Sequence, residues 1–218
     1  EIKSLDITKD VDLGPMCLGS LSHGMTPLEL AGAYMMYGNK GKFITPHSYT
    51  SVTNSYGEVI LEPDVTEVQA ISEETAYIMN RLLYNVLGPG GTAPGLRTKT
   101  TDGVGKTGTT NETKDVWYVG ITPNYVMSTW LGYAENEPMD PVYNANKIKH
   151  PGASYWREVM DTIQEGTTNK DFEVCPTVIK LPYCKASGGA VGPLCTDVAE
   201  GYYKPDTVLD TCTAPGHY

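Results

Sequence analysis

Residues 103–133 read GVGKTGTTNETKDVWYVGITPNYVMSTWLGY, and this stretch decides the fold that the sequence predicts. Residues 103–110 form one candidate strand, and runs rich in β-branched and aromatic residues follow at 116–121 and 125–133. Only residues 122–124 separate the last two runs, which predicts a hairpin, because parallel strands need a much longer connection. The stretch therefore predicts an antiparallel meander of three strands.

A helix signal precedes this region. Residues 1–25 read as a loop, and the sequence TPLE then begins at Thr26. Thr26 is a suitable cap, the proline after it suits the first helical position, and Glu29 completes a capping box. The glycine-containing residues 38–41 predict the end of this helix.

Two further elements are expected between this helix and the meander. Residues 44–52 and 58–61 predict a strand pair around a turn at 54–57. Ser72 then caps a second helix, which ends at the glycine-rich residues 88–91.

The second helix has apolar residues at helical spacing. Ile78 and Leu82 belong to this stripe, which predicts one buried face, although a missing partner element would leave that pair partly exposed. Residues 154–163 predict a closing amphipathic helix. We therefore expect an α/β (α+β) sandwich over residues 1–165, with a Pro- and Gly-punctuated extension at 166–218.

Composition excludes some classes of protein. The net charge is −10, which argues against nucleic acid as a partner because phosphate binding needs a positive surface. No apolar run reaches the ~20 residues that cross a bilayer, and the first residues do not resemble a signal peptide. An export signal or anchor of an exported protein is thus expected outside these residues.

Four of the five cysteines fall in the extension, with eight, ten and sixteen residues between them. These spacings lack the close pairs of common zinc sites, and the four histidines are dispersed, so neither a metal site nor a cofactor is predicted. Disulfides and free thiols remain equal alternatives, and the pairing is open. The four cysteines are Cys175, Cys184, Cys195 and Cys212.

The tripeptide Lys-Thr-Gly in the first strand is one of three short motifs of serine acyl-transferases that react with penicillin. Lys106 would place positive charge near a substrate carboxylate, and Gly108 would let the backbone lie against a ligand. Thr109 offers a hydroxyl to a carboxylate and an N–H to a developing oxyanion. Thr107 alternates to the other face of the strand and should bond inward.

The residues around this motif resemble a known family. Asp115-Val-Trp-Tyr-Val-Gly120, then Thr-Pro at 122–123 and Trp-Leu-Gly-Tyr at 130–133, follow in the order seen in penicillin-binding transpeptidase domains. Residues 24–30 and 91–93 are similar to the helix entry and the Gly-Thr-Ala element of that family. The resemblance is greatest to the bifunctional, class A type represented by penicillin-binding protein 1A.

The resemblance implies specific roles. Lys106 would act in catalysis by bonding the serine of the second motif, and Thr107, Gly108 and Thr109 would bind the substrate carboxylate. The nucleophilic motif Ser-x-x-Lys and the motif Ser-x-Asn are absent from these residues. In this family both precede the matched region, so we expect them upstream, together with a glycosyltransferase domain and a membrane anchor.

The implied activity is D,D-transpeptidation in cell-wall synthesis, with consequences for cell shape, on the extracytoplasmic face of a bacterial membrane. Its partners would be D-Ala-D-Ala stem peptides of peptidoglycan, β-lactams and the cell-wall synthesis machinery. These residues alone should not acylate. The alternatives are a non-catalytic penicillin-binding-like module and an interaction domain whose extension packs against a partner.

Overall fold

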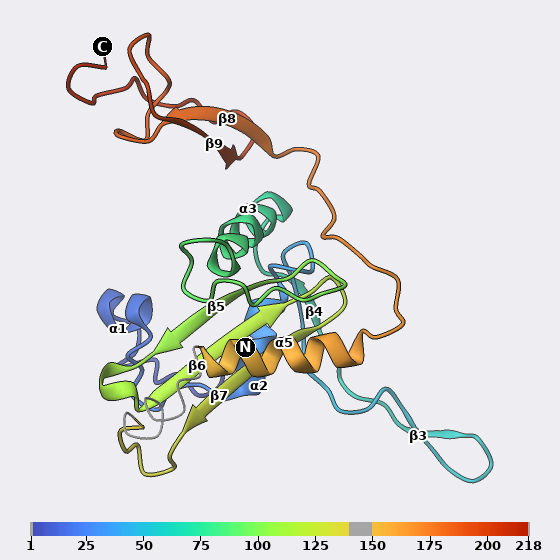
Figure 1. Ribbon diagram of the computed structural model, residues 1–218. Helices are drawn as coiled ribbons and strands as arrows, with labels where there is room; N and C mark the ends of the chain where they lie inside the picture. Colours follow the sequence, from blue (N-terminus) through green and yellow to red (C-terminus); the bar gives the residue numbers. More distant parts are fainter. Residues whose placement is uncertain (1, 140–149, 218) are drawn as a thin grey trace.

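The computed structural model describes residues 2–139 and 150–217. Its centre is an antiparallel sheet with the strand order β5-β6-β7 (Figure 1). The strands are β5 (Val104–Thr109), β6 (Asp115–Ile121) and β7 (Val126–Gly132). The predicted meander and the mixed α/β class are confirmed.

The hairpin between β6 and β7 has the register that the sequence predicts. The pairs run from Asp115 with Gly132 to Ile121 with Val126. The Thr122 N–H donates to the Tyr125 carbonyl at 2.8 Å, so Tyr125 belongs to the turn and not to β7. A short helix η2 (Asn111–Thr113) joins β5 to β6.

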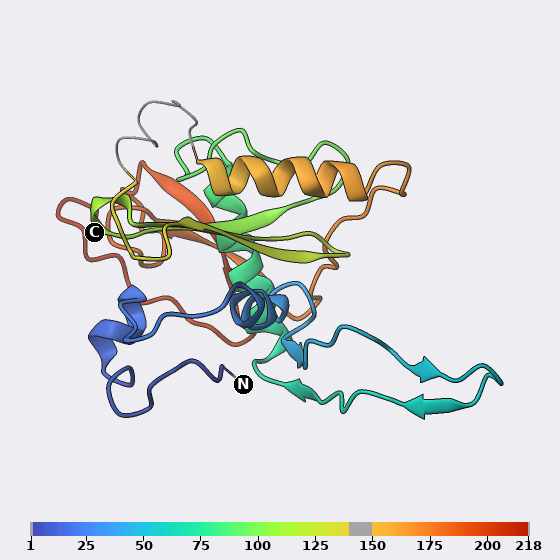
Figure 2. The same ribbon diagram turned by 90° about the horizontal axis from the view of Figure 1, so that it is seen from below.

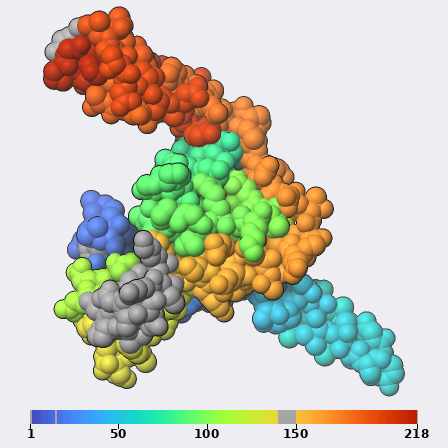
Figure 3. All heavy atoms as spheres, viewed as in Figure 1, coloured from blue at the N-terminus to red at the C-terminus, as the bar shows by residue number. Residues whose placement is uncertain are grey.

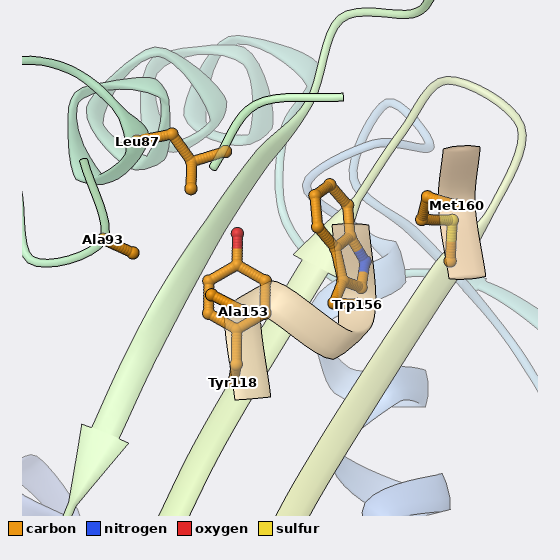
Figure 4. Close-up of a cluster of buried hydrophobic side chains, with 6 residues drawn as sticks. All are labelled: Leu87, Ala93, Tyr118, Ala153, Trp156 and Met160. Atoms are coloured by element: carbon orange, nitrogen blue, oxygen red, sulfur yellow. The ribbon is translucent and has the colours of Figure 1, made fainter. Parts of the chain in front are cut away.

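Helix α5 (Pro151–Ile163) covers one face of the sheet, while α2 (Pro27–Met35) lies on the other (Figure 2). Under α5 the main core contains two fully buried rings, Tyr118 of β6 and Trp156 of α5, whose centroids lie 5.4 Å apart. Figure 4 shows these rings with the other buried members of the cluster, Leu87, Ala93, Ala153 and Met160.

Gly120 makes the close seating of α5 possible. A Cβ placed on Gly120 would lie 2.3 Å from Cε2 of Trp156, well inside van der Waals contact. The indole therefore lies directly on the backbone of β6, and any larger residue at position 120 would push α5 away from the sheet.

We expect Gly120→Ala to destabilise the fold by about 1–3 kcal/mol, because overpacking forces the buried indole or the strand to shift. Urea unfolding, followed by tryptophan fluorescence, measures this change. Gly14→Ala is the matched control, because a Cβ at Gly14 meets nothing within 4 Å. An equal free energy of unfolding in both variants would contradict the packing described above.

On the opposite face, α2 lies on β7, and the Ser128 hydroxyl donates to the Pro27 carbonyl at 2.5 Å. Helix α3 (Glu73–Tyr84) and the following turn η1 (Asn85–Leu87) pack against the beginning of β5. Leu83 of α3 joins Val104 and Ile121 in a second buried cluster.

The predicted cap and buried face of α3 are only partly correct. Ser72 caps α3 as predicted, accepting from the Thr75 N–H at 3.3 Å. Within the helix, however, the buried residues are Ala76, Asn80 and Leu83. Leu82 is 57% exposed and Ile78 is half-buried, which matches the expectation that this pair would be partly exposed.

Glu29 ties the N-terminal segment to α2. Its carboxylate accepts from the backbone N–H groups of Lys3, Ser4 and Thr26 at 2.7–3.0 Å, and Thr26 completes the predicted capping box. The hydrogen bonds from Thr26 and then Ser4 lower the pKa of Glu29 from 4.5 to about 2. Such a lowered pKa means that the ionised carboxylate stabilises the fold.

The stabilisation by Glu29 is fully present above its ordinary pKa of 4.5 and is lost as the pH falls toward about 2. We expect Glu29→Gln to be less stable than the parent at pH 6, with the difference shrinking toward pH 2.5. Thermal melts across this range test the prediction. Glu62→Gln, at an exposed site, is the matched control at pH 6, and a pH-independent gap for Glu29→Gln would contradict the assignment.

Two predictions for residues 1–70 need correction. Residues 1–25 are not all loop, because α1 (Leu13–Leu18) forms there. The expected strand at 44–52 is instead two short strands, β1 (Lys42–Ile44) and β2 (Val52–Thr53). The expected strand at 58–61 is confirmed as β3 (Val59–Leu61), which pairs with β2. In contrast, β1 pairs with β4 (Glu67–Gln69).

The extension carries a hairpin of β8 (Ile179–Cys184) and β9 (Val198–Tyr203) that projects from the rest of the molecule (Figure 3). It touches α3 through edge-to-face contact of Tyr77 with Tyr202. The Thr177 hydroxyl also donates to the Glu74 carboxylate at 2.9 Å. The boundary between residues 165 and 166 stays a prediction.

Among the described residues, no helix has the length and apolar character needed to span a bilayer.

Candidate active site

The Lys-Thr-Gly-Thr motif lies on β5, and no other described strand pairs with the outer edge of β5. The Thr110 N–H donates to the Asp115 carbonyl at 3.1 Å. This bond shows which backbone N–H groups of β5 point toward β6. Because N–H groups alternate in antiparallel pairs, those of Lys106 and Gly108 point toward β6. The N–H groups of Thr107 and Thr109 therefore point outward, away from the sheet.

Helix α3 and η1 cover only the beginning of β5. Val104 and Gly105 are buried, whereas Lys106 and Thr109 are exposed. The Lys106 ammonium donates to the Thr107 carbonyl at 2.8 Å, and no ion pair involving Lys106 occurs in the part of the chain that is described. A positive charge is thus available beside two outward N–H donors.

Thr107 and Thr109 share the face of β5 that looks toward α5. Together they line a small hollow of about 20 Å³ with His150 and Gly152 at the start of α5. The Thr107 and Thr92 hydroxyls are hydrogen-bonded at 2.7 Å in an exposed contact, on the face of β5 opposite that of Lys106. The hydroxyl of Thr107 is held in place, whereas that of Thr109 faces the exposed end of the strand.

Sequence reasoning missed two of these neighbours as site residues. Thr92 belongs to the Gly-Thr-Ala element, but nothing in the sequence says that its hydroxyl meets Thr107. His150 precedes α5 with φ of 52°, a left-handed conformation that is uncommon outside glycine. His150 lies 41 positions after Thr109 in the sequence, and the packing of α5 places it beside β5. No local sequence pattern predicts this contact.

On the face of β5 opposite α5, Gly108 lets the side chain of Trp117 lie close to the strand. A Cβ on Gly108 would lie 3.2 Å from Cβ of Trp117, its partner on β6. The four motif residues thus lie together on one exposed strand segment, with an ammonium, two outward N–H groups and two hydroxyls. Such a set of donors suits a carboxylate or a developing oxyanion.

Comparison with known proteins agrees with this geometry. A family model described as penicillin binding protein transpeptidase domain matches residues 14–163. Penicillin-binding protein 1A of Clostridium botulinum is 29% identical over 176 residues, which cover 81% of this chain and 21% of that protein. The chain therefore spans about a fifth of the length of this relative.

Two solved structures show the same fold. Penicillin-binding protein 1A from Haemophilus influenzae superposes with a TM-score of 0.68 at 20% identity, covering 88% of this chain and 34% of that one. The PonA1 protein from Mycobacterium tuberculosis, in complex with penicillin V, gives a TM-score of 0.56 at 24% identity, covering 70% and 42%.

The match over residues 14–163 exceeds half of the chain. The chain belongs to the penicillin-binding protein transpeptidase family. Two of the three proteins described above carry the name penicillin-binding protein 1A.

Because Lys106 is exposed, its role in function can be tested separately from any role in stability. We expect Lys106→Met to change the free energy of unfolding by no more than about 0.5 kcal/mol, since the ammonium packs against nothing buried. Urea unfolding of this variant beside the parent provides the measurement. A loss of several kcal/mol would instead make Lys106 a structural residue.

Proposed function

We propose that β5 is the substrate-binding wall of a peptidoglycan D,D-transpeptidase that works by serine acyl transfer. The observation that carries this proposal is the exposed Lys-Thr-Gly-Thr segment, with the N–H groups of Thr107 and Thr109 directed away from the sheet. The family match supplies the reaction class.

In the proposed reaction, a serine hydroxyl attacks the carbonyl carbon of the penultimate D-alanine of a stem peptide. The peptide bond to the terminal D-alanine breaks, and the released amine takes up the proton that leaves the serine. An amine of a neighbouring stem then attacks the serine ester, forms the new peptide bond and returns a proton to the serine. The sum is one peptide bond broken and one formed.

Within this scheme β5 has two tasks. The terminal carboxylate of the donor would accept hydrogen bonds from the hydroxyls at the Thr109 end of the strand, with Lys106 providing positive charge. The outward N–H of Thr109 would stabilise the oxyanion of the tetrahedral intermediate. Thr92 would keep the Thr107 hydroxyl in place for this purpose.

β-Lactams are the natural probe of this proposal. Their strained amide and neighbouring carboxylate present the same groups as a D-Ala-D-Ala terminus. The family name and the penicillin V complex of the M. tuberculosis relative support binding of this class.

The serine and its lysine would come from residues outside this sequence, because Ser-x-x-Lys does not occur within it. A membrane anchor, a glycosyltransferase domain and a place on the extracytoplasmic face belong to the same proposal. The absence of Ser-x-x-Lys also favours one alternative, a module that binds wall peptides or β-lactams without catalysis.

Acylation by a fluorescent penicillin tests the proposal. We expect no label on the 218-residue chain and stoichiometric label on the protein extended upstream to include Ser-x-x-Lys. In the extended protein, Lys106→Met or removal of the Thr109 hydroxyl should slow acylation by about 10–10², because each change removes a charge-assisted contact to the donor carboxylate.

The controls use the same extended protein. Glu62→Gln, far from β5 in sequence and exposed, should acylate at the parental rate. Failure of the folded extended protein to label would favour the non-catalytic module. Label on the 218-residue chain itself would place a nucleophilic serine within it and overturn the assignment.

A further inference from the structure

Four potential metal ligands converge in the extension. The Sγ atoms of Cys184, Cys195 and Cys212 and a ring nitrogen of His217 all lie within 4.8 Å of one another. Sγ of Cys195 is 3.6 Å from Sγ of Cys212, and Sγ of Cys184 is 3.2 Å from Nδ1 of His217. Tetrahedral zinc with bonds of about 2.0–2.3 Å holds such atoms roughly 3.5–3.8 Å apart.

The fold brings these ligands together from three segments. Cys184 ends β8, Cys195 lies in the loop between β8 and β9, and Cys212 and His217 belong to the last segment of the chain. That segment crosses the hairpin, where the Ala190 N–H donates to the Asp210 carbonyl at 2.7 Å. The ligand set is therefore built by tertiary structure.

Two glycines in the loop between β8 and β9 let the last segment of the chain pass close to this loop. A Cβ on Gly189 would lie 2.6 Å from the Asp210 carbonyl oxygen, and one on Gly192 would lie 2.7 Å from that of His217. The Gly192 N–H also donates to Sγ of Cys195 at 3.2 Å. Backbone donors of this kind stabilise a thiolate ligand and fix its direction.

The extension has little else to hold it folded. Its buried cluster consists of Cys184, Cys212 and Ala214, with Cys195 packed against it. Small units with so small a core usually need a disulfide or a metal. Five large aliphatic side chains of the same segment are exposed: Val174, Val191, Leu194, Val198 and Val208.

The number of ligands favours a metal over a disulfide. A disulfide would use two of the three converging sulfurs and leave a thiol and an imidazole together in the interior. A tetrahedral metal uses all four groups, and three thiolates with one imidazole are a common set in structural zinc sites. Carboxylate ligands, which favour calcium or magnesium, are absent from this group.

We propose that Cys184, Cys195, Cys212 and His217 form a structural Zn²⁺ site that folds the extension. Each zinc ion would displace the thiol protons of the three cysteines and take the neutral imidazole as its fourth ligand. The site is closed by protein ligands and leaves no position for substrate, so its role is to stabilise. This proposal replaces the expectation of no metal site, because spacing along the chain could not reveal ligands that three segments bring together.

The test uses the full chain, reduced and freed of metal, then given Zn²⁺ alone and passed over a desalting column. We expect about one zinc per chain by elemental mass spectrometry. Cys184→Ser, Cys195→Ser, Cys212→Ser and His217→Ala should each lose most of this zinc. The matched controls are the exposed Cys17→Ser, the buried Cys175→Ser and the exposed His23→Ala, which should retain it.

Two further measurements separate loss of the site from loss of the fold. All three tryptophans, Trp117, Trp130 and Trp156, lie outside the extension, so their fluorescence reports whether the main body remains folded. Trypsin cleavage after Lys180 and Lys185 reports the extension itself. With the tryptophan signal unchanged, chelation of zinc should speed this cleavage in the parent and not in the four ligand variants.

Cobalt gives an independent reading of the ligands. Co²⁺ bound in place of zinc should show thiolate charge-transfer bands that weaken in each cysteine variant. Three results would overturn the proposal: less than about a tenth of an equivalent of zinc on the folded parent, equal zinc on ligand and control variants, or a disulfide within the cluster in the zinc-treated protein.

Discussion

The contact between Gly120 and Trp156 is the constraint on which the rest of the structure depends. With no side chain on Gly120, α5 lies against β6, and its Gly152 and His150 reach the same face as Thr107 and Thr109. The pairing of β6 with β5 then fixes the direction of every donor on the motif strand. The position of the outer edge of β5 is thus set by a contact on the neighbouring strand β6.

The two ends of β5 have different environments, and the difference suits a binding strand. At its beginning, Val104 is buried with Leu83 and Ile121, so the strand is anchored in the core. At its far end Lys106 and Thr109 are exposed, and η2 turns the chain back toward β6. A rigid strand with one exposed end holds its donors in fixed directions, which lowers the cost of ordering them around a ligand.

The elements best predicted from sequence were those specified by local chemistry. The capping box of Thr26 and Glu29, the Ser72 cap and the short β6–β7 connection each carry their signal within a few residues. Prediction failed where long-range contacts decide, as at β1, which pairs with β4. Likewise, the motif strand could be found from its sequence, whereas only the fold places Thr92 and His150 beside it.

The open edge of β5 has a second consequence. A strand that offers unpaired backbone groups to a ligand offers them equally to the same strand of another copy. The exposed charge of Lys106 opposes such self-association, since two copies meeting along this edge would bring their ammonium groups together. One residue would thus serve both recognition and solubility, which limits the substitutions that this position can accept.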